Sequence, residues 1–361
     1  MKHLIDIMQL TPQEIMELID TACAIMEHPE QYAHKCDGKI LATLFFEPST
    51  RTRLSFESAM LSLGGKVLSV ASAESSSASK GETVADTVRV VSCYSDIIAM
   101  RHPKEGAPLV ASMHAQVPVI NAGDGGHNHP TQTLTDLMTI YREKGRLDDL
   151  TIGLCGDLKF GRTVHSLIKA LSRYEGIRVI LISPEELRLP DYMLQEMSAN
   201  SKLEFHEVRT MEEVMPELDI LYMTRVQKER FLDEEEFDRV KNSFVLDPDK
   251  LKTARKDMII LHPLPRVNEI TRAVDNDPRA AYFRQVENGK FVRMALIYML
   301  LKWADENKPF DHTPHFDEEY IVNELVCPNR RCISATEDVD QLFRRHADGT
   351  CRCAYCESKA K

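Results

Sequence analysis

The chain has 361 residues, which suggests two or three domains, and its 43% hydrophobic and 28% charged residues are typical of a globular protein. Its formal net charge of −11 argues against a nucleic-acid partner, which would select a basic surface. No apolar run approaches the ~20 residues of a membrane span, and the N-terminal residues lack the apolar core of a signal peptide. We therefore expect a cytoplasmic protein without a membrane partner.

Residues 39–60 carry the first chemical signal. An apolar run at 40–46 predicts a buried strand, Glu47-Pro48 ends it, and Ser49 stands at the N-cap position of the helix that follows. A helix N-terminus presents free N–H groups and a partial positive charge, and an arginine can bind two oxygens of one anion. The pattern therefore predicts a phosphate site, although hydroxyls that only cap the helix and a solvated arginine would give the same string. Its side chains are Ser49, Thr50, Arg51 and Thr52.

The string SxRTRxSFE in this stretch resembles the carbamoyl-phosphate loop of the aspartate/ornithine carbamoyltransferase family. Four further strings fit the same family in the same order, and the resemblance covers residues 1–308. It implies a carbamoyl-phosphate-binding domain at residues 1–130, with a returning helix at 288–308, and an aspartate-binding domain at 131–287. Both are expected to be doubly wound parallel-sheet α/β domains.

Three more signals follow in the first half. A Ser-rich loop at 71–83 ends in Lys-Gly-Glu-Thr, and composition alone favours a plain connector. Arg101 follows a predicted strand at 95–100 and, taken alone, is better explained by a structural pair with a carboxylate. His129 and Gln132 lie three apart at the start of a predicted helix, 131–144. The family resemblance assigns all three strings to the active site, with Ser76 and Lys80 supplied to a neighbouring subunit and with His129 and Gln132 on the carbamoyl oxygen and nitrogen.

Strands and helices alternate in the second half. Predicted strands at 150–155, 179–182, 203–208, 220–224 and 258–261 are separated by helices, with two expected near Glu185 and Glu212. This alternation indicates a parallel sheet covered on both faces. Glycines follow the first of these strands, but GxGxxG is absent, which disfavours a nicotinamide-binding site.

The second half also resembles the aspartate branch of the family. GDLKFGRTVHSL implies that Arg162 binds a substrate carboxylate, and the string Arg-Val-Gln implies the same for Arg225 and Gln227. The loop His-Pro-Leu-Pro, 262–265, carries Pro263 where the ornithine enzymes usually carry cysteine, and its prolines fix the backbone so that it can aim carbonyls at the carbamoyl NH₂. A long amphipathic helix is expected at 280–308.

The last 35 residues form a different pattern. An acidic, proline-bearing linker at 309–322 precedes two close cysteine pairs, Cys327-x₄-Cys332 and Cys353-x₂-Cys356, at 323–361. Two such pairs are typical of a zinc ribbon with structural zinc, although free thiols or disulfides are the alternative and Cys351 could replace Cys353. The strings CPNRRCIS and CxYCE resemble the zinc domain of the regulatory chain of aspartate carbamoyltransferase, without room for the nucleotide-binding domain that normally precedes it.

Together the two resemblances imply an aspartate carbamoyltransferase with a zinc module fused to its catalytic region. The implied reaction converts carbamoyl phosphate and L-aspartate to N-carbamoyl-L-aspartate and phosphate, the second step of de novo pyrimidine (UMP) biosynthesis. We expect neither a covalent intermediate nor a catalytic metal. The implied carbamoyl-phosphate residues are Ser49, Thr50, Arg51, Thr52, Ser76, Lys80, Arg101, His129, Gln132, Leu264 and Pro265. The implied aspartate residues are Lys80, Arg162, Arg225 and Gln227, and the implied catalytic residues are Arg51, Thr52, Arg101 and His129.

The family forms trimers with active sites between subunits, so a homotrimer or a dimer of trimers is expected, with the zinc module docked on a neighbouring catalytic domain. Two alternatives stay open. A carbamoyltransferase for ornithine would keep the first half, but the His-Pro-Leu-Pro and Arg-Val-Gln strings argue against it. A non-catalytic zinc-ribbon scaffold is opposed by the complete catalytic strings.

Overall fold

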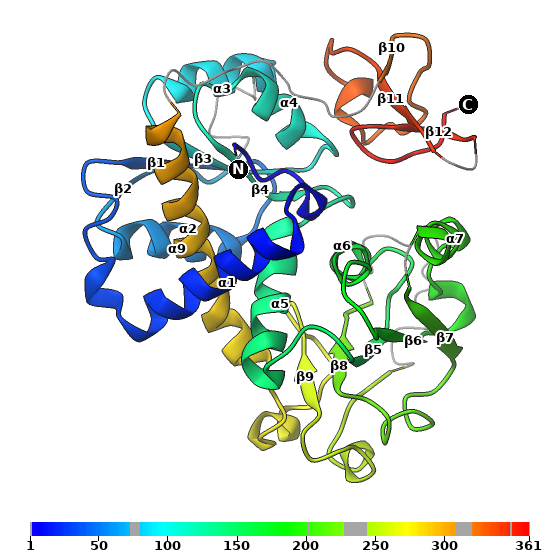
Figure 1. Cartoon of the computed structure of the whole chain (residues 1–361). Coiled ribbons are helices and arrows are strands. Elements are labelled where there is room, and N and C mark those ends of the chain that lie inside the picture. The colour runs from blue at the N-terminus through cyan, green and yellow to red at the C-terminus, as the bar shows by residue number, and fades with distance from the viewer. Residues whose placement is uncertain are drawn as a thin grey trace. The chain divides into compact units, whose positions relative to one another are not determined.

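The computed structural model describes residues 2–72, 80–200, 202–226, 244–307, 320–346 and 349–360. These residues fall into two compact units, Met1–Thr131 with Lys290–Lys361, and Gln132–Gly289 (Figure 1). Each unit contains a parallel sheet covered by helices, so the predicted α/β class is confirmed. Among the described residues, no helix combines the length and apolar character that crossing a membrane requires.

The first unit is built on a four-stranded parallel sheet with the order β2-β1-β3-β4. Its strands are β1 (Ile40–Phe45), β2 (Lys66–Val70), β3 (Ile97–His102) and β4 (Val119–Asp124). The strand predicted to end at Met100 continues through Arg101 and His102, because Arg101 pairs with Phe45 and His102 with Asp124. Arg101 therefore belongs to the strand end and not to the loop after it.

Helices cover both faces of this sheet. Ala42, Leu44, Ile98 and Met100 alternate along β1 and β3 and pack in one apolar cluster with α3 and α4. Figure 1 shows α3 and α4 on one side of the sheet and α1, α2 and α9 on the other. The bounds of these helices are α1 (Pro12–Glu27), α2 (Thr50–Ser62), α3 (Val84–Ser92), α4 (Ala107–His114) and α9 (Tyr282–Glu306).

The C-terminal module is a small antiparallel sheet with the order β10-β11-β12. Its strands are β10 (Ile321–Val322), β11 (Leu342–Arg345) and β12 (Cys351–Cys353), so the first strand occupies the last two residues of the expected linker. Ile333, Phe343 and Tyr355 are buried in the same cluster as α3 and α4. The module therefore packs on the first domain of its own chain.

Main-chain contacts fix the module at the start of α4. The N–H of Glu105 donates to the carbonyl of Arg331 at 3.1 Å, and the N–H of Ile333 donates to the carbonyl of Glu105 at 2.9 Å. Gly106 follows with a φ of 81°, and a Cβ built on it would lie 2.4 Å from the Cβ of Tyr355. Only glycine fits this position, because both the positive φ and the close approach of the module exclude a side chain.

The second unit contains a five-stranded parallel sheet with the order β7-β6-β5-β8-β9. Its strands are β5 (Thr151–Cys155), β6 (Arg178–Ile182), β7 (Glu204–Val208), β8 (Ile220–Met223) and β9 (Ile259–Leu261). Its other helices are α5 (Pro130–Lys144), which begins at the boundary of the two units, α6 (Arg162–Leu171) and α7 (Asp191–Asn200).

Two expected helices of this unit differ from the prediction. The helix near Glu185 is a short 3₁₀ helix, Glu185–Leu187, and α7 begins only after Pro190. No helix forms around Glu212, where the chain makes turns. Met211, Val214 and Met215 are buried there, and Pro216 prevents their apolar spacing from extending into a helix.

Candidate active site and metal centre

Most of the residues predicted for carbamoyl phosphate lie along one edge of the first sheet. β1, β3 and β4 are parallel neighbours, so their carboxyl ends meet at that edge. The loop with Ser49 follows β1, Arg101 lies in the end of β3, and His129 follows β4. Ligands of open parallel sheets bind outside the carboxyl ends of the strands.

The start of α2 has the features of an anion site. The N–H of Arg53 is the first to bond within the helix, to the carbonyl of Ser49 at 3.2 Å. The N–H groups of Thr50, Arg51 and Thr52 precede it and point out of the helix end. Ser49 is the N-cap residue, but its side chain makes no capping hydrogen bond. Its hydroxyl is therefore available to a ligand, which the simple capping interpretation did not predict.

Arg101 is fixed beside this helix start. Its Nη2 lies 2.6 Å from Oε2 of Glu47, and Nη1 donates to the carbonyl of Ala122 at 3.4 Å. Burial lowers the pKa of Arg101, the carboxylate of Glu47 opposes that shift, and the nearby charge of Arg51 adds to it. The structural pair weighed for Arg101 thus exists, and it holds the guanidinium at the sheet edge.

Asp124 organises the loop that leads to His129. One carboxylate oxygen accepts from the N–H of Asn128 at 2.9 Å, and the other accepts from the N–H of Gly106 at 2.8 Å. The N–H of Asp124 donates in turn to the carbonyl of Asn128 at 3.2 Å. His129 comes next and is 5% exposed. Sequence reasoning assigned no role to Asp124, although the glycine-rich turn around it marked the loop.

The loop predicted to act in trans is described only at its end. Lys80 is exposed and lies three residues before Thr83, whose hydroxyl caps α3 by accepting from the N–H of Asp86 at 3.1 Å. Ser76 lies outside the described residues.

Residues predicted for aspartate, and the two predicted for the carbamoyl NH₂, lie at the carboxyl edge of the second sheet. Arg162 is the first residue of α6 in the segment after β5, Arg225 follows β8, and Leu264 and Pro265 follow β9. β5, β8 and β9 are parallel neighbours, which places these segments along one edge. Gln227 lies outside the described residues.

The ends of β5 and β8 are joined around Gly156. The hydroxyl of Thr224 donates to the carbonyl of Cys155 at 2.9 Å and accepts from the N–H of Asp157 at 2.8 Å. Gly156 has a φ of 112°, and a Cβ there would lie 2.6 Å from the carbonyl oxygen of Thr224. The segments that carry Arg162 and Arg225 are therefore held together by main-chain geometry that needs glycine.

Gln132 is held by a carboxylate that sequence reasoning did not assign. Its Nε2 donates to Oδ1 of Asp136 at 2.7 Å, one helical turn along α5. Because an ionised carboxylate only accepts hydrogen bonds, it fixes which end of the Gln132 amide turns toward it.

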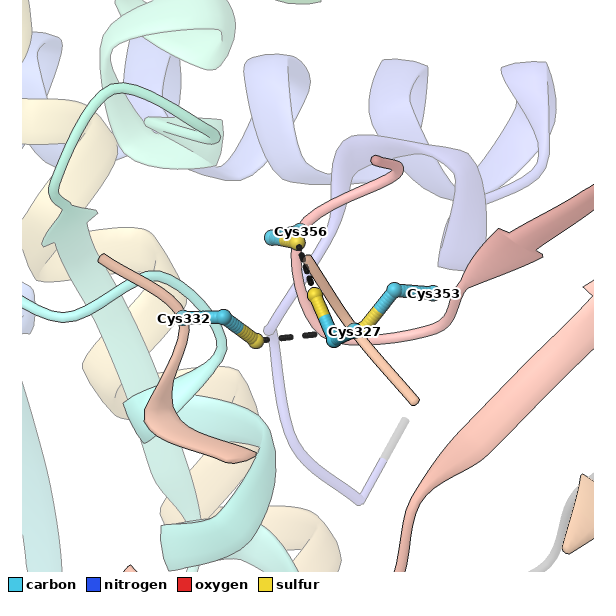
Figure 2. A group of neighbouring side chains, drawn as sticks. All are labelled: Cys327, Cys332, Cys353 and Cys356. Atoms are coloured by element: carbon cyan, nitrogen blue, oxygen red, sulfur yellow. Dashed lines mark hydrogen bonds between the residues drawn. The ribbon is translucent and has the colours of Figure 1, made fainter. Parts of the chain in front are cut away.

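The module brings four cysteines together (Figure 2). The sulfurs of Cys327, Cys332, Cys353 and Cys356 all lie within 4.8 Å of one another, and Cys351 is not in this group. Cys327 and Cys356 are 3.5 Å apart, and Cys332 and Cys353 are 3.8 Å apart. Tetrahedral bonds of ~2.3 Å to zinc would separate sulfurs by ~3.8 Å. The site therefore fits one tetrahedral metal ion with four thiolate ligands.

The module also contacts two loops of the candidate active site. The Glu105 carboxylate accepts from Nδ2 of Asn329 at 2.5 Å and from the N–H of Gly126, in the His129 loop, at 3.3 Å. The Glu337 carboxylate accepts from the N–H of Val84, at the start of α3, at 3.0 Å. The His129 loop and the loop that ends at α3 are thus each linked to the module through a carboxylate, that of Glu105 and that of Glu337 respectively.

His127 adds an ion-pair link to the same loop. Its Nδ1 lies 3.1 Å from Asp124, and its Nε2 lies 3.9 Å from Glu357, the residue after Cys356. Burial opposes protonation of His127, but the two carboxylates outweigh it and raise its pKa well above the usual value.

Comparison with known families matches nearly the whole chain. Residues 2–142 match the carbamoyl-P binding domain of aspartate/ornithine carbamoyltransferase, and residues 148–300 match its Asp/Orn binding domain. The aspartate carbamoyltransferase catalytic subunit of Lachnoclostridium phytofermentans is 64% identical over 83% of this chain and 98% of its own length. The chain belongs to the aspartate/ornithine carbamoyltransferase family. Residues 319–361 match the metal-binding domain of the aspartate carbamoyltransferase regulatory chain.

Solved structures of the family agree in fold. The catalytic subunit of M. jannaschii aspartate transcarbamoylase is 47% identical, with a TM-score of 0.79 over 85% of this chain and 100% of that chain. Aspartate transcarbamoylase from Trypanosoma cruzi, in a complex with carbamoyl phosphate and aspartate, is 42% identical, with a TM-score of 0.78 over 82% of this chain and 96% of that chain. The family resemblance and the aspartate branch expected from the sequence are thereby confirmed.

Proposed function

We propose that this chain is an aspartate carbamoyltransferase, which transfers the carbamoyl group of carbamoyl phosphate to the amine of L-aspartate. The products are N-carbamoyl-L-aspartate and phosphate, and the reaction is the second step of de novo pyrimidine biosynthesis. The observation that carries the proposal is the 64% identity to a catalytic subunit of that name. The arrangement of predicted residues at the carboxyl edges of both sheets supports it.

Residues of the first unit bind carbamoyl phosphate and activate its carbonyl. The N–H groups and hydroxyls at the start of α2 hold the phosphate with Arg51. Thr52, Arg101 and His129 stabilise the negative charge that develops on the carbonyl oxygen, where preorganised donors act most strongly. Because Glu47 already holds Arg101 in place, little reorganisation is needed when charge develops.

Residues of the second unit orient the carbamoyl NH₂ and the attacking amine of aspartate. Gln132 and the carbonyls of Leu264 and Pro265 accept hydrogen bonds from the carbamoyl NH₂. Arg162, Arg225 and Gln227 bind the aspartate carboxylates, so that the amine attacks the carbonyl carbon. The bond from carbon to the phosphate oxygen then breaks, and the departing phosphate accepts the amine proton. Holding both substrates in one site supplies much of the rate.

The active unit is a homotrimer, alone or as a dimer of trimers, in which Ser76 and Lys80 reach a neighbouring subunit. Leu54, Leu61 and Leu68 are 52%, 61% and 46% exposed on α2 and β2, and β2 is an edge strand of its sheet. Exposed apolar side chains beside the open edge of a sheet favour a partner surface, and a second copy of this chain supplies one.

The C-terminal metal is zinc, bound by Cys327, Cys332, Cys353 and Cys356 in a structural role. Four buried thiolates at tetrahedral spacing leave no position for a substrate, which is typical of structural zinc. Thiolates stay available for metal in a reducing compartment, and this supports a cytoplasmic location.

The test is carbamoyl transfer by the purified full-length chain, with aspartate and ornithine offered separately. We expect transfer to aspartate alone, and Arg225→Ala should lower kcat/KM for aspartate by ~10²–10³-fold because a substrate carboxylate loses its charged partner. Arg178→Ala is the matched control, because Arg178 lies at the other end of the sheet and pairs with Glu217 at 2.6 Å. Transfer to ornithine would contradict the substrate assignment, and transfer to neither would favour a scaffold.

A further inference from the structure

Four buried polar side chains of the second unit have no role in the proposed mechanism, yet they form one connected network. Asp136, His262, Glu269 and Gln285 are exposed by 0%, 1%, 5% and 1%. Buried polar groups are costly unless every one of them is paired. The network runs from α5 through α9 to the loop after β9.

Asp136 is the centre of the network. Its Oδ1 accepts from Nε2 of Gln132 at 2.7 Å and from Nε2 of Gln285 at 2.6 Å, and its Oδ2 accepts from the hydroxyl of Tyr222 at 3.0 Å. Three donors converge on the carboxylate, so both of its oxygens accept hydrogen bonds. The amide nitrogen of Gln132 is committed to this contact, so its oxygen is the end of the side chain that remains for a ligand.

Gln285 carries the network from helix to loop. Its Nε2 donates to Asp136, and its Oε1 accepts from the N–H of His262 at 2.9 Å. A single buried amide therefore sets the distance between the carboxylate that holds Gln132 and the first residue after β9.

His262 and Glu269 shape the loop itself. Nδ1 of His262 accepts from the N–H of Leu264 at 2.8 Å, so the ring proton is on Nε2, which donates to Oε1 of Glu269 at 2.7 Å. Oε2 of Glu269 accepts from the N–H of Val267 at 2.9 Å. Burial alone would raise the pKa of Glu269, but the hydrogen bonds from His262 and Val267 outweigh it and lower the pKa.

Leu264 shows why the loop needs this support. Its φ is 53°, in the left-handed region that a branched residue seldom adopts. Such a conformation persists only where the surroundings hold it. The hydrogen bond from the Leu264 N–H to His262 is the contact that holds it in this loop.

We propose that Asp136, Gln285, His262 and Glu269 are positioning residues that set the acceptors for the carbamoyl NH₂ and thereby select it over a methyl group. The acceptors are Oε1 of Gln132 and the carbonyls of Leu264 and Pro265, so this inference rests on the function proposed above. Hydrogen bonds link the side chain of Gln132, through Asp136, Gln285 and His262, to the N–H of Leu264, which precedes Pro265. A site built to accept N–H bonds discriminates strongly against a ligand that lacks them, because its polar groups are then left unpaired.

The test compares carbamoyl phosphate with acetyl phosphate, which carries CH₃ in place of NH₂. The variants are Gln285→Met, which keeps the volume and removes both hydrogen bonds, and Glu269→Gln, which removes the charge on the loop. For each, we expect KM for carbamoyl phosphate to rise ~10–100-fold, the cost of misplacing one or two acceptors. The inhibition constant of acetyl phosphate should stay within ~3-fold, because a methyl group uses no acceptor.

Asn288→Leu provides the matched control. Asn288 is 0% exposed, accepts from Arg142 and donates to Oγ1 of Thr139, so it bridges the same two helices one turn away without touching Gln132. It should lower thermal stability without changing the selectivity for carbamoyl over acetyl phosphate.

The outcomes separate the two proposals. If the unaltered chain transfers no carbamoyl group to aspartate, the proposed function fails and this inference fails with it. If the unaltered chain is active but both ligands weaken equally in the variants, or selectivity is unchanged, the network is only structural. If one variant does not fold, the other measures the same selectivity from the opposite end of the network.

Discussion

Glu105 is the residue through which the metal module and the His129 loop are most directly joined. Glu105 is 9% exposed, and its carboxylate accepts from Asn329 in the module and from Gly126 in the loop. Glu105→Gln keeps the shape of the side chain but replaces one acceptor oxygen with an NH₂ group. One of the two donors must then face another donor.

The two hydrogen bonds of Glu105 set how much docking free energy the substitution should remove. A hydrogen bond to a charged group contributes about 1.5–3 kcal/mol, and a neutral one about 0.5–1.5 kcal/mol. Losing one of the two hydrogen bonds of Glu105 and weakening the other would cost about 2–4 kcal/mol of docking free energy. Burial raises the pKa of Glu105, so the neutral side chain recovers part of this cost. We expect a net loss of about 1–2 kcal/mol, which shifts the equilibrium between docked and undocked module by ~5–30-fold.

The assay loads the protein with zinc and follows the transfer of that zinc to excess chelator with a colorimetric dye. If metal leaves through the undocked module, Glu105→Gln should accelerate release by the same ~5–30-fold factor. Glu324→Gln is the control, because Glu324 is an exposed residue of the module. Equal release rates for the parent chain and Glu105→Gln, with zinc bound in both, would refute the reasoning.

Three further predictions follow from substitutions of one or two side chains. Arg101→Met should lower kcat by ~10²–10³-fold in steady-state kinetics, because a donor to the developing oxyanion is lost; an unchanged kcat would exclude this role. Leu61→Glu with Leu68→Glu should convert trimers to smaller species by light scattering, whereas an unchanged mass would remove this face from the interface. Burial lowers the pKa of His102 to about 4, so the unfolded chain binds the extra proton first and stability should fall as pH drops from ~6.5 towards 4. Urea unfolding should show this slope, and His102→Gln should flatten it; identical slopes would contradict the assignment.

Helices and strands whose ends are marked by nearby residues, such as a proline or an N-cap residue, could be predicted from the sequence. The apolar run, the proline and the N-cap residue that precede α2 follow one another within a dozen residues, and the structure contains that strand and that helix. The four clustered cysteines were also predictable, because close pairs bring their own ligands together. Around Glu212 the same reasoning was wrong, since helical spacing of buried methionines and valine is equally compatible with turns against a core.

The polar network could not be predicted from local pattern. Asp136 and Gln285 are 149 positions apart, and nothing in either segment indicates that their side chains meet. Likewise, Glu105 and Asn329 are 224 positions apart. Such pairs depend on how helices and loops are packed, whereas the spacing of residues along one element does not encode them. Motif strings therefore predicted candidate substrate contacts, but they gave no indication of the residues that hold those side chains in place.

Because the module is covalently joined to the catalytic region, weaker docking contacts are enough to keep it bound there. Twelve residues, 308–319, separate Asn307 from Tyr320 in the sequence. A tether this short gives the module an effective concentration on the order of millimolar at its own docking surface. Modest contacts then suffice for docking, so the carboxylates of Glu105 and Glu337 can act mainly in ordering the loops they reach. Since a thiolate-bound module depends on its metal to fold, metal occupancy should govern the order of both loops within a single polypeptide.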